Sequence, residues 1–443
     1  MLGGYRRELL PNGLRVLGVE NSALHSFVCS AYIHAGPRFE PPEKTGLTHF
    51  LEHMLMQGSE NFPRSSDIMR GVEDLGGVVD GQTYTEFLNV TFGVHRKHWE
   101  RVMRIAADVL LRPLFDPEEL EQEKSIVAQE VFRHRDRDGR NISVHELMYE
   151  LLLKQQPEEA GTRGCPPITQ TFDRTMLEAH YREFFVPQNM VLCLAGGFDF
   201  DEVLSYVAEQ FGAMEAGDGV PELPPLEVGR EAARSFYRPT EALPVAEAIY
   251  AHRAYPLRDD RSDALRAICQ LLGGGLSSRL FARVREELGL VYEVQSYPQT
   301  YSDTGSANVY VSVSVENLPR ALEAVLGVLE DLLGENFTEG ELNRYKESAR
   351  CGMEILCDHP SRLADWFGKQ ELFLGPEGVL TPEEYVAKQE RLTLQDVKQV
   401  LRDLFAESGG NLAVVGPFDD DTSQAVQQLF PQQQVMQTAA TGE

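Results

Sequence analysis

The sequence predicts an α+β fold made of two homologous halves, each an antiparallel-rich sheet with helices packed mainly on one face. Two internal repeats, and the alternation of strand and helix patterns in the first half, support this prediction. The segment FDPEELEQEKS at 115–125 returns as FTEGELNRYKES at 337–348, and a long helical pattern follows each copy. An apolar strand closed by glycine lies near the end of each half, at 189–198 and at 411–418. Strand patterns also lie between helical patterns in the first half.

The elements of the first half follow from local patterns, taken in chain order. Residues 5–20 indicate a hairpin that turns at Pro11-Asn12-Gly13, because Asn and Gly tolerate the backbone angles of a tight turn. A helix at 116–134 begins with Asp116 as N-cap, with Pro117 at its first position and Glu119 at its third. Between them we expect an extended run at 26–35, a strand at 87–94, and helices at about 45–58, 66–75 and 97–112.

The chain of 443 residues is longer than one ordinary domain of roughly 100–200 residues, so at least two domains are expected. Residues 214–233 are rich in Pro, Gly and Glu and lack a sustained apolar period, which is typical of a linker. We therefore predict an N-terminal half at 1–213, a C-terminal half at 234–430, and a polar tail at 431–443.

Charge and hydropathy exclude two classes of partner. The net charge of −28 argues against nucleic acid, whose phosphates require a basic surface. The N-terminal segment lacks the apolar core of a secretory signal, and no apolar stretch reaches the length of about 18 residues that spans a bilayer. The expectation is a cytoplasmic protein with no membrane partner.

The segment THFLEHML at 48–55 carries the clearest chemical motif. His49 and His53 are four residues apart, so on a helix both imidazoles leave one face and can meet one ion. With Glu52 they form H-x-x-E-H, in which Zn²⁺ with an open coordination position activates a water and the glutamate accepts its proton. The competing interpretation is a pair of core histidines satisfied by ordinary hydrogen bonds. A third ligand near the two histidines would distinguish a metal site from such a pair.

The third ligand is expected on the helix at 116–134. Glu123 and Glu130 are seven residues apart and share a face with apolar neighbours, where two carboxylates favour a cation. His134 lies one turn beyond Glu130, and spacing alone does not exclude it. For either glutamate taken singly, a salt-bridged or solvated helix face is the ordinary interpretation.

The motif and its flanking segments resemble the pitrilysin/insulinase family of inverzincin zinc metallopeptidases, and in particular its half-length, processing-peptidase-like members. The similar segments are GPRFEPPEKTGLTHFLEHMLMQGS, LGGVVDGQTYTEFLNVTF and YREFFVPQNMVLCLAGGF. The resemblance implies one Zn²⁺ per chain held by His49, His53 and Glu130. It also implies Glu52 as the catalytic base and Glu123 as a second acidic residue that supports the site.

A second signature of the family lies in the C-terminal half, in GGGLSSRLFARVREELGLVY at 273–292. The resemblance implies that Arg285 and Tyr292 contact the substrate carbonyl and the tetrahedral intermediate, as preorganised donors toward a developing oxyanion. Without it, Arg285 is an ordinary surface arginine and Tyr292 an ordinary core tyrosine. The repeat partners of Glu123 and Glu130 are Tyr345 and Gly352, so only the first half is expected to hold the metal.

The resemblance also implies a peptide-binding edge strand at Asp80, Gly81 and Gln82, where the family often has Asn-Ala at the first two positions. Asp80 cannot donate as Asn does, and its charge favours basic side chains in the substrate. Met56-Gln57 replaces the more usual Phe-Lys after the motif.

The predicted function is a zinc-dependent metalloendopeptidase that hydrolyses unstructured peptides or presequence-like segments inside a closed chamber, with a metal-bound water as nucleophile. The expected assembly is a homodimer with composite active sites, in which Arg285 and Tyr292 complete the site of the partner chain. The alternative is a non-catalytic processing-peptidase-like subunit, or the obligate partner of a heteromeric peptidase.

Overall fold

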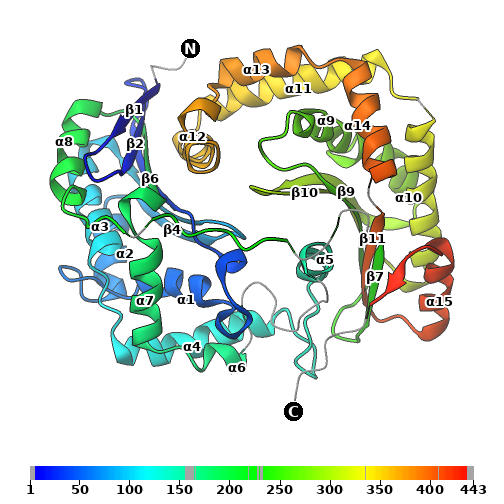
Figure 1. Cartoon of the computed structure of the whole chain (residues 1–443), viewed down its shortest axis with the longest axis horizontal. Coiled ribbons are helices and arrows are strands. Elements are labelled where there is room, and N and C mark those ends of the chain that lie inside the picture. Colours follow the sequence, from blue (N-terminus) through cyan, green and yellow to red (C-terminus); the bar gives the residue numbers. More distant parts are fainter. Residues whose placement is uncertain are drawn as a thin grey trace. The chain divides into compact units, whose positions relative to one another are not determined.

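The computed structural model describes residues 5–154, 164, 166–217, 219–226, 229, 233–334, 336–407 and 409–436 (Figure 1). The chain forms two compact units that interleave in the sequence. Unit 1 contains residues 1–131, 162–224 and 352–385, and unit 2 contains residues 132–161, 225–351 and 386–443. Each unit therefore includes a segment from the other half of the chain.

Unit 1 is built on a six-stranded sheet in the order β1-β2-β6-β3-β5-β4. All neighbouring strands are antiparallel except β2 and β6. The predicted hairpin at its edge is confirmed, with Gly13 at a φ of 94° in the turn and the Asn12 side chain accepting from the Leu14 amide. In sheet order, the strands are β1 Tyr5–Leu9, β2 Arg15–Glu20, β6 Met190–Gly196, β3 Ser26–Ile33, β5 Leu88–His95 and β4 Val78–Thr83.

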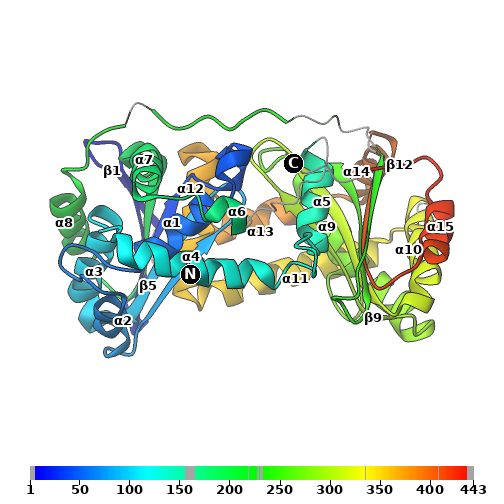
Figure 2. The same cartoon turned by 90° about the horizontal axis from the view of Figure 1, so that it is seen from below.

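Most helices of unit 1 cover one face of this sheet, where their apolar sides form a single core with the strands. On the opposite face lies one helix, α12 Pro360–Leu374, whose Leu363 and Phe367 pack with Tyr32 and Val191 of the sheet (Figures 1 and 2). The helices of the first face are α1 Leu47–Leu55, α2 Ser65–Glu73, α3 Trp99–Leu111, α4 Pro117–Phe132, α7 Arg174–Phe184 and α8 Phe200–Phe211.

The approach of α12 to the sheet is close, and an ion pair fixes it. A Cβ on Gly368 would lie 2.2 Å from the ring of Tyr32, so only glycine fits at that position. The carboxylate of Glu371 is fully buried and accepts from the Arg7 guanidinium of β1 at 2.9 and 3.1 Å. This helix belongs to the C-terminal half of the sequence, yet it completes the unit that contains the N-terminal half.

Unit 2 repeats the plan with a sheet in the order β12-β7-β11-β8-β10-β9. Helices α9 Arg261–Gly273, α10 Leu318–Leu333 and α14 Leu394–Glu407 share a core on one face, while α5 Val144–Leu153 packs on the other (Figure 1). The strands are β12 Gln434–Val435, β7 Arg234–Pro239, β11 Gly410–Gly416, β8 Ala246–Ala254, β10 Gly305–Val313 and β9 Val291–Thr300. The remaining long helices are α11 Glu339–Cys357, α13 Pro382–Glu390 and α15 Asp420–Leu429.

The predicted fold class is confirmed. The order β2-β6-β3-β5-β4 of one sheet has the same connectivity as β7-β11-β8-β10-β9 of the other, as expected for a duplicated half. Antiparallel pairs predominate in both sheets, and helices cover mainly one face of each. Within the part of the chain that the structure describes, no helix is long and apolar enough to cross a membrane.

Candidate metal centre

Helix α1 holds the H-x-x-E-H motif because its other face is anchored in the core of unit 1. Phe50, Leu51, Met54 and Leu55 are fully buried there, so the motif residues project from the remaining face. Glu40 fixes the start of the helix, since its two carboxylate oxygens accept from the amides of Gly46 and Thr48, each at 2.6 Å. A carboxylate is favourable at this position because the helix N-terminus carries partial positive charge.

The structure brings three predicted ligands together. The Nε2 atoms of His49 and His53 lie 3.3 Å apart. Helix α4 places the Oε2 atom of Glu130 3.7 Å from Nε2 of His49 and 3.5 Å from Nε2 of His53. Among the described residues, these three side chains form a cluster able to hold a metal ion. His134, the other candidate left open by spacing, lies beyond the end of α4 and outside this cluster.

The geometry of the cluster fits zinc. Tetrahedral Zn²⁺ with bonds of about 2.0–2.1 Å separates its ligand atoms by about 3.3–3.4 Å, and the three observed separations are close to this value. Two imidazole nitrogens and one carboxylate oxygen are also the donor set of a catalytic zinc site, which keeps the fourth position open.

Glu123 supports the cluster from behind. Its buried carboxylate accepts from Nδ1 of His53 at 2.7 Å, which turns Nε2 of that ring toward His49 and Glu130. Gln57 donates to the other oxygen of Glu123 at 2.8 Å and so fixes the carboxylate in turn. This place for Glu123 agrees with the supporting role implied by the resemblance, whereas the contribution of Gln57 was not predicted.

The electrostatics of the cluster also favour a cation. Burial alone lowers the pKa of the His53 imidazole, but its hydrogen bond to Glu123, the nearby carboxylate of Glu130 and the charge of Glu52 outweigh burial and raise that pKa to about 10. The carboxylates around the two imidazoles therefore stabilise positive charge at this point, either on a proton or on a metal ion.

Glu52 is near the cluster but outside it. The Thr83 hydroxyl donates to its Oε2 atom at 2.9 Å. Burial raises the pKa of the Glu52 carboxyl above its usual value, and the nearby charges of Glu130 and Asp80 act in the same direction. A carboxylate with a raised pKa that is not needed as a ligand is suited to accept a proton.

The predicted peptide-binding residues lie on β4, which among the described strands pairs with β5 alone and forms the edge of its sheet. Asp80 and Gln82 are exposed on one side of the strand, where the Gln82 amide donates to the Asp80 carboxylate at 3.0 Å. Gly81 lies on the other side, toward Glu52. The edge strand is thus adjacent to the candidate base.

The predicted oxyanion donors lie together in unit 2. Arg285 belongs to a π-helix, Phe281–Glu287, and its guanidinium carbon lies 5.7 Å from the ring centroid of Tyr292 and 4.9 Å from that of Phe281. Tyr292, at the start of edge strand β9, is 77% exposed. That exposure disagrees with the ordinary interpretation of a core tyrosine.

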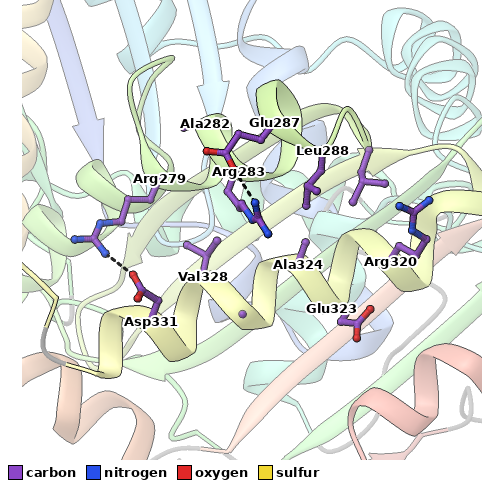
Figure 3. A pocket seen from close by; sticks show the side chains of 12 residues that line it. Arg279, Ala282, Arg283, Glu287, Leu288, Arg320, Glu323, Ala324, Val328 and Asp331 are labelled. Atoms are coloured by element: carbon purple, nitrogen blue, oxygen red, sulfur yellow. Dashed lines mark hydrogen bonds and ion pairs between the residues drawn. The ribbon is translucent and has the colours of Figure 1, made fainter.

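A cavity of about 710 Å³ lies beside the same π-helix, between it and α10 (Figure 3). Its arginines include Arg279, which pairs with Asp331 at 3.1 Å, and Arg283, which pairs with Glu287 at 2.6 Å. None of the predicted site residues lines this cavity. We assign it no part in the candidate site.

Comparisons with known proteins agree with this geometry. Residues 15–164 match the family described as "Insulinase (Peptidase family M16)", and residues 171–349 match "Peptidase M16 inactive domain". The chain is 27% identical over 412 residues to the "Uncharacterized zinc protease YmxG" of Bacillus subtilis, covering 93% of this chain and 98% of that protein. An uncharacterized zinc protease of Mycobacterium tuberculosis is 28% identical over 418 residues, with 93% of each chain covered.

Solved structures of similar fold include a protease from Helicobacter pylori, with a TM-score of 0.86 and 17% identity over 94% of this chain and 100% of that one. The periplasmic protease PqqL from Escherichia coli matches with a TM-score of 0.77 and 17% identity, and 99% of this chain covers 51% of it. The two family matches, one on each half, together with relatives of similar length, show that the chain belongs to the insulinase family, peptidase family M16, as a member of about half length.

Proposed function

We propose that this protein is a zinc-dependent metalloendopeptidase that cleaves unstructured peptides or presequence-like segments. The observation that carries the proposal is the arrangement at α1 and α4, where three ligand atoms lie at zinc-like separations while Glu52 stays out of the ligand set. The names of the zinc protease relatives support the same class of activity.

Each group of residues has its own role in the proposed hydrolysis. His49, His53 and Glu130 would hold the zinc ion, which would serve as a Lewis acid for the scissile carbonyl and for the attacking water. Glu52 accepts the proton of that water and delivers it to the leaving amine. Arg285 and Tyr292 donate hydrogen bonds to the developing oxyanion.

The substrate class follows from the edge strand. An extended peptide can add to the outer side of β4 through backbone hydrogen bonds, which require no particular side chains. Folded proteins do not present such a segment, so unstructured peptides are the expected substrates. The carboxylate of Asp80 on this strand favours basic side chains in the peptide. We also propose that a homodimer encloses the peptide in a chamber.

The test compares the wild type with Glu52→Gln. Both proteins are analysed for zinc, and both are assayed with an unstructured basic fluorogenic peptide. We expect about one zinc per chain in each protein and cleavage only by the wild type, because the substitution removes the base and leaves every ligand. Loss of zinc from Glu52→Gln alone would refute the assignment of the base. Zinc without turnover in the wild type would point to a different peptide or a missing partner, and no zinc in either protein, even after supplementation, would favour a non-catalytic subunit.

A further inference from the structure

The candidate base is held by the same strand that presents the edge of the sheet. The hydroxyl of Thr83 donates to the Oε2 atom of Glu52 at 2.9 Å. Two residues earlier on the same face of β4, a Cβ on Gly81 would lie 2.7 Å from Oε1 of Glu52. One carboxylate oxygen therefore accepts from a hydroxyl donor, and the other faces the backbone of the same strand at Gly81.

We propose that Thr83 is a positioning residue for Glu52, and that its hydroxyl on β4 restrains the Oε2 atom of the base. The inference rests on the proposed function, since it concerns how the base of that reaction is oriented. Thr83 does not touch the reacting atoms and acts only through the carboxylate of Glu52.

The hydroxyl of Thr83 is itself fixed in space. Its residue pairs with Leu88 in the β4–β5 ladder, and the hairpin closes just beyond it with a hydrogen bond from the Tyr84 amide to the Phe87 carbonyl at 2.8 Å. Leu88 is fully buried in the core. Because a β-branched side chain has few χ1 rotamers on a strand, the donor has little freedom to move.

Glu52, by contrast, has a long side chain that would sample several rotamers without a partner. Restraining it in the reactive orientation before substrate arrives removes an entropic cost from the chemical step. The restraint comes from the strand on which an extended peptide is proposed to add. Removing the hydroxyl should therefore lower kcat while leaving the affinity for the peptide nearly unchanged.

The test uses Thr83→Val, which keeps the shape of the side chain and removes the donor. With the fluorogenic peptide we expect kcat to fall about tenfold, KM to stay within about twofold, and zinc content to match the wild type. Thr83→Ser restores the donor and should recover most of kcat.

The matched control is Thr91→Val on β5, whose hydroxyl lies 2.8 Å from that of Ser30 on β3, inside the same sheet and away from Glu52. It should leave kcat unchanged. An unchanged kcat in Thr83→Val beside an active wild type would overturn the inference, as would equal losses in the Ser and Val variants or a loss of zinc from Thr83→Val.

Crystal structures of the zinc-loaded wild type and Thr83→Val provide a readout that does not depend on turnover. We expect the Glu52 carboxylate to rotate or lose order in the variant, and an unmoved carboxylate would overturn the inference. If the wild type fails to cleave peptides, the proposed function fails, while these two structures still decide whether Thr83 positions Glu52.

Discussion

The two ring nitrogens of His53 face different carboxylates, and this difference separates the roles of Glu123 and Glu130. Nδ1 donates to Glu123 at 2.7 Å, while Nε2 lies 3.5 Å from Glu130, too far for a strong hydrogen bond and suitable for two ligands of one ion. One glutamate therefore orients the imidazole, and the other is placed where it can share a metal ion with that imidazole.

Replacing each glutamate by glutamine should separate these roles. Glu130→Gln removes a charged ligand and should weaken zinc binding more than Glu123→Gln, for which a loss of about 10–100-fold is typical of a supporting partner. Competition with a chelator measures both affinities. Glu121→Gln is the matched control on the same helix, since the exposed Glu121 carboxylate pairs with Lys124 at 2.8 Å and lies outside the cluster. A larger loss in Glu123→Gln would make Glu123 the ligand.

His180 should make the stability of unit 1 depend on pH. Burial, with a smaller contribution from the charge of Lys44, lowers its pKa to about 4, and its Nε2 lies 2.9 Å from the Thr48 hydroxyl. The unfolded chain binds this proton near pH 6.5, so stability present above about 6.5 is lost as the pH falls toward 4. The loss should reach about 3 kcal/mol.

Denaturant unfolding of zinc-free wild type and His180→Gln, at pH 7 and at pH 4.5, measures this contribution. The advantage of the wild type over the variant should shrink as the pH falls, because only the wild type must protonate a buried imidazole. An advantage that is equal at the two pH values would contradict the lowered pKa.

At the scale of residues, the sequence predicted the three clustered side chains and the supporting Glu123, but not the other partners of the site. His49 and His53 follow from helical spacing, and the resemblance chose Glu130 among the candidates on α4. Gln57, Thr83 and Glu40 were not predicted as partners, because each meets its target through tertiary contacts that no local pattern encodes. In the sequence, Gln57 stands out only because the family more usually has lysine at this position.

Among the elements, helix α12 depends on one buried ion pair. Arg7→Leu leaves the fully buried Glu371 carboxylate without its guanidinium, which should cost about 3 kcal/mol, at the low end of the usual range because Arg7 is partly exposed. Arg6→Leu is the matched control, since it removes an exposed pair with Asp201, which solvent screens, and should cost much less stability than Arg7→Leu.

Denaturant unfolding compares the two variants, and hydrogen exchange of the α12 amides shows whether this helix opens first. Equal losses of stability, or unchanged exchange in α12 of Arg7→Leu, would show that packing alone holds the helix in place.

Local patterns predicted most elements of the first half. The hairpin at 5–20 is confirmed, and Asp116 caps α4 by accepting from the amides of Glu118 and Glu119. The positions of α5 and α12 were not predicted, because an amphipathic pattern shows that a helix has an apolar face but not which sheet covers it. The π-helix that carries Arg285 also has no signal in apolar periodicity.

At the scale of the molecule, the proposed composite site predicts complementation between inactive variants. Glu52→Gln and Arg285→Ala are each expected to be inactive. After random subunit exchange, half of the dimers contain one chain of each variant. Each mixed dimer has one intact site out of two, so about a quarter of wild-type activity should return. Cleavage of the fluorogenic peptide measures it, and light scattering verifies the dimer.

Failure of complementation after exchange has been demonstrated with differently tagged chains would contradict the composite site. Both residues of each site would then come from one chain. The matched control is a mixture of Glu52→Gln with His49→Ala, which places both defects in the metal-binding half and should regain no activity.

The repeat at 115–125 and 337–348 predicted the duplication, and the matching strand orders confirm two halves of one fold. The sequence boundaries at 213 and 234 follow composition along the chain. The compact units instead interleave, because α5 packs on the sheet of unit 2 and α12 on the sheet of unit 1. Contacts between distant segments set this arrangement, and linear composition does not report them.

This interleaving has a consequence for biosynthesis. The sheet of unit 1 is complete once β6 has left the ribosome, but the apolar surface around Tyr32 and Val191 stays bare until α12 emerges, after most of the chain has been translated. The nascent N-terminal half therefore passes through a long, aggregation-prone interval in which chaperones can act. For the same reason, a truncated chain that retains every zinc ligand would still lack part of its core.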